Sequence, residues 1–122
     1  MKRVDVGRHP YSIRVYASGE ITFSNMLCRR MGLKENDLVS LYVSDSPGVE
    51  EIYIAKSGIG VEAKQRNGCK QLRINSKDYA ELILRGAGSG VFRIGETVEK
   101  DGDEYFTVIY KKNYGRKEVC QV

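Results

Sequence analysis

The chain has 122 residues, of which 41% are apolar and 30% are charged, a balance typical of one compact domain or two small intertwined units. No apolar run approaches the roughly 20 residues of a membrane-spanning helix, and the amino-terminal residues lack the apolar core of a secretory signal, so we expect a cytoplasmic protein. Twenty basic against sixteen acidic side chains give a net charge of +4, which permits binding to a polyanion but also suits an ordinary solvated surface.

After a polar arm at residues 1–10, the chain begins with the pattern of a β-hairpin. Apolar side chains alternate with polar ones through residues 11–17 and again through residues 20–23, as they do in strands with one buried face. The intervening pair, residues 18–19, has the sequence Ser-Gly, which favours a tight reversal. These residues therefore predict a short antiparallel hairpin.

A short helix is predicted next, because the hydrophobic period changes from two to about 3.6 at Ser24. Ser24 can cap the helix, and Leu27 and Met31 lie four residues apart on one face. Gly32 is placed to end the helix in the left-handed conformation, with Leu33 packing back beneath it. A second hairpin should follow, with strands at residues 38–43 and 50–56 around a turn at residues 45–48.

The second half of the chain repeats this order of elements. Its expected elements are strands at 59–63 and 72–74 around an Asn67-Gly68 turn, a helix at 77–84 capped by Asn75-Ser76, and a hairpin of 91–99 with 105–111. The matched positions, at offsets of 51 to 54, are Ile21 with Leu72, Phe23 with Ile74, Met31 with Leu82, Leu33 with Leu84, Gly48 with Gly102, Ile52 with Phe106 and Ile54 with Val108.

These matches predict two hairpin-helix-hairpin repeats, residues 11–57 and 58–112, followed by a basic tail at residues 113–122. One such unit is too small to bury its own core, so we expect both to close a single, mainly β barrel with two short helices. A swapped-hairpin, cradle-loop or double-psi-like barrel would fit, as a monomeric pseudo-dimer or a homodimer. The alternative is that two β-rich segments match by chance.

The first repeat resembles the swapped-hairpin domain of AbrB-type transition-state regulators and MazE-type antitoxins, the SpoVT-AbrB-like group. The residues that carry the resemblance are Gly19, Ile21, Phe23, Leu27, Arg29, Arg30, Met31, Gly32, Leu33, Lys34, Glu35, Asp37, Val39 and Leu41. The resemblance implies a DNA-binding protein, such as a transcriptional regulator or an antitoxin-like factor. Two positions depart from the family pattern: Glu20 replaces a basic residue, and Ser24 replaces a proline at the start of the helix.

Basic side chains at seven positions are the candidates for contact with double-stranded DNA. Arg29 and Arg30 should project from the first helix, because Leu27 and Met31 face inward. Guanidinium groups there can reach phosphates, although they would equally serve as solvated helix residues. The other candidates, which have the same alternative as ordinary surface charges, are Arg14, Lys64, Arg66, Lys70 and Arg73.

A protein-interaction module on the same barrel is the alternative function. At the positions assigned to Arg29 and Arg30, the second helix has Ala80 and Glu81, which weakens the case for symmetric DNA binding. An enzyme ranks third among the candidate functions and is not expected, because no acid–base pair or nucleophile motif stands out in the sequence.

No cofactor or metal is expected from the sequence. The three cysteines lack C-x-x-C spacing and His9 is the single histidine, so a structural zinc site is not predicted. Cys28 is best explained as a small apolar residue of the helix, with a reactive thiol as the alternative.

Overall fold

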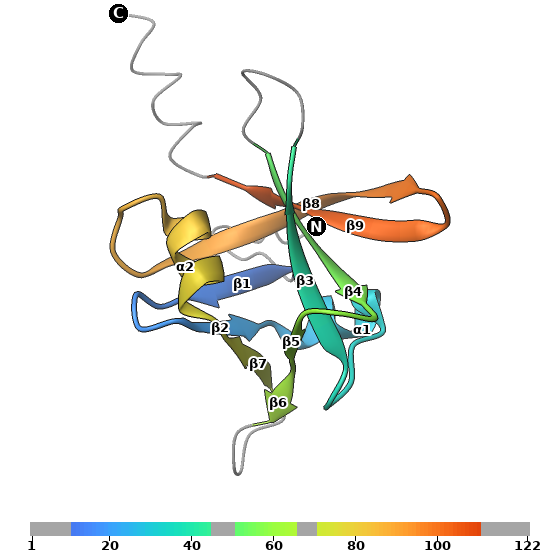
Figure 1. Cartoon of the computed structure of the whole chain (residues 1–122), viewed down its shortest axis with the longest axis horizontal. Helices are drawn as coiled ribbons and strands as arrows, with labels where there is room; N and C mark the ends of the chain where they lie inside the picture. Colours follow the sequence, from blue (N-terminus) through green and yellow to red (C-terminus); the bar gives the residue numbers. More distant parts are fainter. Residues whose placement is uncertain (1–10, 45–50, 66–70, 111–122) are drawn as a thin grey trace, which may run out of the picture.

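Nine strands and two short helices make up the described part of the chain, residues 11–44, 51–65 and 71–110, in a computed structural model (Figure 1). All neighbouring strands are antiparallel, and the sheet curls into a nearly closed, barrel-like shape. The prediction of a mainly β fold with two short helices is therefore confirmed. None of the helices in the described ranges has the length and apolar character needed to cross a membrane.

Across the sheet, β5 from the second half is followed by pairs of strands that come in turn from the first half and the second half of the chain. Their bounds are β1 Ser12–Val15, β2 Glu20–Phe23, β3 Leu38–Val43, β4 Ile52–Ser57, β5 Val61–Glu62, β6 Lys64–Gln65, β7 Leu72–Asn75, β8 Gly90–Lys100 and β9 Asp103–Ile109. Their order across the sheet is β5-β3-β4-β9-β8-β1-β2-β7-β6.

The two ends of this sheet, β5 and β6, are separated by one residue, the fully buried Ala63. Its backbone N–H donates to the carbonyl of Asp37, and its carbonyl accepts from the N–H of Asn36, both at 2.8 Å. Since β5 pairs with β3 and β6 pairs with β7, the bent segment around Ala63 holds the two edges of the sheet together. Neither edge strand is therefore left with a long unpaired edge to which a strand of another chain could pair.

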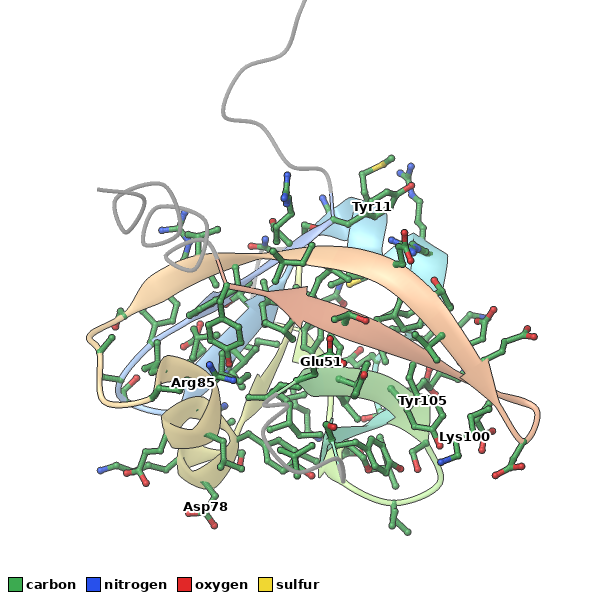
Figure 2. The ribbon with its side chains drawn as sticks, turned by 90° about the horizontal axis from the view of Figure 1, so that it is seen from above. Tyr11, Glu51, Asp78, Arg85, Lys100 and Tyr105 are labelled. Atoms are coloured by element: carbon green, nitrogen blue, oxygen red, sulfur yellow. The ribbon has the colours of Figure 1, made fainter. Side chains whose placement is uncertain are left out.

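The first helix, α1 (Asn25–Met31), has the ends that its sequence predicts. The Ser24 hydroxyl accepts a hydrogen bond from the N–H of Leu27 at 3.3 Å, and Gly32 closes the helix with φ of 68°. Leu27 and Met31 are buried, and Leu33 packs beneath them. α1 lies on the opposite side of the barrel from the second helix (Figures 1 and 2).

The second helix, α2 (Lys77–Leu84), packs against β1 and β2 and corrects two expectations. Leu82, which was matched with the buried Met31, is 51% exposed, whereas Ala80 is fully buried and does not take the outward position of Arg29. The reason is register: Met31 is seven residues after its cap Ser24, and the residue seven after the cap Ser76 is the buried Ile83.

Several strand bounds also differ from the sequence expectation. Ile59 is 71% exposed rather than part of a strand, because the chain reverses at Gly60, where φ is +128°. The last hairpin turns at Asp101 and Gly102, whose positive φ values of 55° and 85° suit the two-residue turns of antiparallel hairpins. The predicted turns at 45–48 and at Asn67-Gly68 lie outside the described residues.

Buried side chains from both halves form one hydrophobic cluster. Ile13, Phe23 and Leu27 from the first half lie in the same interior as Ile74 and Ile83 from the second, and each is at most 2% exposed. Because neither half has a separate core, stability is shared between the halves.

Strand pairing between the halves is reciprocal. β2 pairs with β7 and β4 pairs with β9, while β1 pairs with β8 and β5 pairs with β3. In the first two of these pairs Thr22 lies opposite Arg73 and Tyr53 lies opposite Thr107. These partners are 51 and 54 residues apart, which are the offsets of the matched positions in the sequence.

Candidate nucleic-acid interface

Three of the predicted DNA-binding side chains lie in one line across the sheet. Arg14 in β1 pairs with Thr22 in β2, Thr22 pairs with Arg73 in β7, and Arg73 pairs with Lys64 in β6. Residues directly opposite each other in antiparallel strands share a face, and the flanking residues Ile13 and Val15 point into the core. Arg14, Thr22, Arg73 and Lys64 therefore form a row on the outer face, which we call the basic row.

The basic row crosses four neighbouring strands of the sheet, β1, β2, β7 and β6. Strands in a sheet are about 4.8 Å apart, so the three strand spacings from Arg14 to Lys64 span roughly 14 Å measured along the curled sheet. That distance is close to the roughly 12 Å width of the major groove of B-form DNA. Long basic side chains at both ends and one between them can reach phosphates along such a span.

Two cations of the row are not neutralised within the described structure. Arg14 is exposed, and neither it nor the half-buried Arg73 forms an ion pair with another described residue. The Nε atom of Arg73 is buried without a hydrogen-bond partner in that part of the chain. Lys64 pairs with Glu62 at 3.2 Å, but both side chains are about half exposed and such pairs contribute little.

One acidic side chain lies beside the row. Glu20 is two residues before Thr22 in β2 and lies on the same outer face. The Thr22 hydroxyl donates a hydrogen bond to the Glu20 carboxylate at 3.2 Å. This carboxylate reduces the positive potential near the centre of the row. Glu20, identified in the sequence as a departure from the AbrB/MazE pattern, therefore lies at the surface where that departure matters.

The two arginines of α1 have different environments, and the expectation that both project outward is wrong for Arg30. Its Nη2 donates to the Thr97 hydroxyl at 2.6 Å, and its guanidinium lies 4.7 Å from the ring centre of Tyr11 and 5.2 Å from that of Phe106. Figure 2 shows Tyr11 beside α1. Arg30 therefore ties the helix to β8 and β9, whereas Arg29 is exposed.

Arg29 lies beside a groove of about 300 Å³ between α1 and the β6–β7 pair. Its lining residues are Asn25, Cys28, Arg29, Leu33, Lys34, Glu35, Gln65 and Leu72. Gln65 and Leu72 alternate with Lys64 and Arg73 along β6 and β7, so the groove is not part of the face that carries the basic row. Arg66 and Lys70, the remaining two candidates, lie outside the described residues.

Two basic residues, one in the groove and one on the face of the basic row, were missing from the sequence prediction. Lys34 lines the groove, and Arg93 in β8 pairs with Ser12 of β1, on the same outer face as Arg14. The alternation of residues 91–94 indicates that Arg93 points outward. Only the pairing of β1 with β8, which sequence does not reveal, places it near Arg14.

The groove also contains the partly buried thiol of Cys28. Burial raises the pKa of this thiol, and a backbone hydrogen bond with Leu72 offsets part of the shift. A thiol with a raised pKa is a poor nucleophile, which agrees with an apolar packing role. Within residues 11–44, 51–65 and 71–110, no cluster of three or more His, Cys, Asp or Glu side chains is placed to hold a metal ion.

No family model matches this chain, and comparison with curated proteins and with solved structures gave no match either.

Proposed function

We propose that this chain is a DNA-binding protein of the AbrB/MazE type, a transcriptional regulator or antitoxin-like factor, in which two hairpin-helix-hairpin repeats form one swapped-hairpin barrel. The reciprocal strand pairing supports this architecture, because the opening strand of each half, β1 or β5, pairs with the first strand of the other half's closing hairpin, β8 or β3. Two repeats within one chain would then take the place of the two intertwined chains of the single-repeat families.

The observation that carries the DNA-binding proposal is the basic row. Arg14, Lys64 and Arg73 come from strands in both halves, yet the strand pairing brings them onto one outer face. Each can neutralise one phosphate, and the released counterions provide a salt-dependent driving force. Arg73 is held by its half-buried position, so it loses less side-chain freedom on binding than a fully solvated arginine.

The basic row is not symmetric about its centre. Arg73 and Thr22 face each other where the proposed repeats meet, so one repeat supplies a guanidinium where the other supplies a hydroxyl. We therefore expect binding through phosphates with little dependence on sequence, rather than recognition of two equal half-sites.

A protein-interaction module on the same barrel is the second candidate. Glu20 beside the row and the exposed Leu82 on α2, at the position that Arg30 has on α1, favour this alternative. It predicts a complex with another protein and no retention on DNA at low salt.

The test is a titration of a fluorescent 30-base-pair duplex at several salt concentrations between 50 and 200 mM. If the three basic side chains each neutralise one phosphate, log K should fall against log salt with a slope of about −2.7 or steeper. Absence of binding at 50 mM salt, or binding that does not depend on salt, would overturn the proposal.

A further inference from the structure

The outer face of the sheet formed by β3, β4, β9 and β8 carries a second candidate site, which is rich in tyrosine. Tyr42 lies opposite Tyr53 in the β3–β4 pair, and Tyr105 lies opposite Val98 in the β8–β9 pair. Together they enclose a pocket of about 330 Å³, which we call the tyrosine pocket, lined by Tyr42, Val43, Ser44, Tyr53, Val98, Lys100 and Tyr105.

Two of the three tyrosine rings in this pocket are in contact and lie nearly at right angles. Tyr42 and Tyr105 meet edge to face, with ring centres 5.1 Å apart and planes at 83°, so the two rings present faces in different directions. Val43 and Val98 beside them are 56% and 42% exposed, which leaves apolar surface at the pocket rim. An aromatic ring face attracts cations, and perpendicular rings can contact one cation from two sides.

The charges around the tyrosine pocket also favour a cationic occupant. Glu51 accepts a hydrogen bond from the Tyr53 hydroxyl at 2.5 Å, which is the main reason that the pKa of Tyr53 is raised. The pKa of Tyr105 is raised by burial and by the negative charges of Asp103 and Asp101. Both phenols therefore stay neutral, with the Glu51 carboxylate beside Tyr53 and those of Asp103 and Asp101 near Tyr105.

One cation, Lys100, lines the pocket, and it lies opposite Asp103 in the β8–β9 pair. Figure 2 shows Glu51, Lys100 and Tyr105 on the part of the molecule formed by β4, β8 and β9. Among the described residues, the carboxylates of Glu51, Asp101 and Asp103 outnumber this ammonium group, so the two sites would attract different partners.

We infer that the tyrosine pocket binds a cationic side chain, an arginine or lysine flanked by apolar residues, presented by a partner polypeptide. The cation would lie against the rings of Tyr42 and Tyr105, the carboxylates would complement its charge, and the apolar neighbours would cover Val43 and Val98. This inference is independent of DNA binding, because the pocket shares no residue with the basic row.

The test uses the full chain with carbon-13-labelled tyrosine rings and two short probes, acetyl-Val-Arg-Val-amide and the same peptide with neutral citrulline. We expect saturable shifts of the Tyr42 and Tyr105 ring signals with the arginine peptide, and binding of the citrulline peptide weaker by about 5-fold or more. Tyr105→Leu keeps apolar volume but removes the ring, so it should weaken arginine-peptide binding by a similar factor. Tyr16→Leu, outside the pocket, is the matched control and should leave the affinity unchanged.

Three results would overturn the inference. Equal affinity for the two peptides would show that no cation is recognised, and the absence of ring shifts would show that the pocket does not bind such peptides. Self-association that Tyr105→Leu abolishes would mean that a second copy of this chain occupies the pocket. DNA binding by the Tyr105→Leu variant is expected to be unchanged, so failure here is distinguishable from failure of the proposed function.

Discussion

Replacing Arg14 and Arg73 together by glutamine is the sharpest test of the basic row. These two arginines form no ion pair with a described residue, whereas Lys64 is already paired with Glu62. Each phosphate contact contributes about 0.9 to the salt slope for duplex DNA, so the double variant should have a slope less negative by about 1.8. Between 50 and 200 mM salt, this difference corresponds to about 12-fold in affinity.

A matched control distinguishes the effect of losing the basic row from the effect of lowering the net charge. Lys56→Gln with Lys100→Gln also lowers the formal charge from +4 to +2, but both lysines lie on strands outside the row. Lys56 interacts with Asp37 and with the Gly32 carbonyl, so its loss is expected to cost at most about 1 kcal/mol of stability. The control should bind DNA with a nearly unchanged slope.

The assay is fluorescence anisotropy on the same duplex, with circular dichroism to verify that both double variants are folded. An equal decrease of the salt slope in the two double variants would refute the claim that the basic row contacts DNA, because net charge alone would then explain binding. An unchanged slope in the Arg14 and Arg73 variant would also refute it and would place the DNA contacts elsewhere on the chain.

Three further predictions concern particular contacts. Arg30→Ala should lower the free energy of unfolding in urea by about 1–3 kcal/mol, whereas Arg29→Ala should change it by less than about 0.5 kcal/mol; equal effects would contradict the inward role of Arg30. Gly60→Ala should cost at least about 2 kcal/mol by thermal or urea unfolding, because φ is +128° and a Cβ would collide with the Val39 backbone, whereas Gly58→Ala has open space and should be tolerated. Because burial raises the pKa of Cys28, less thiolate is present at pH 8 to 9, so mass-resolved iodoacetamide labelling of Cys28 should be slower in the folded chain than in urea.

Local features were predictable because they depend on neighbouring residues alone. Alternation located β2 and β7, and a serine before each helix identified the caps Ser24 and Ser76. Gly32 was expected to end α1 because glycine adopts positive φ without strain, and it does so. The same reasoning failed for α2, where a one-residue difference in register between two similar helices reverses which side chains are buried.

The candidate site was predictable only in part. The sequence indicated that Arg14, Lys64 and Arg73 point away from the core, but not that they share a row, since that depends on which strands become neighbours. Arg30 was expected at the surface with Arg29, yet its long side chain reaches Thr97, which is 67 residues away in the chain.

The sequence by itself therefore determined the types of element, their caps, their turns and which face of each strand is apolar, because these follow from backbone conformation and local periodicity. Only the tertiary structure decided the pairing of β1 with β8 and of β2 with β7, the closure around Ala63 and the alignment of Arg14, Arg73 and Lys64 in the basic row. The physical reason is that alternation specifies a buried face for every strand but does not specify its neighbours. Those neighbours are selected by how all the apolar faces can be buried in one shared interior.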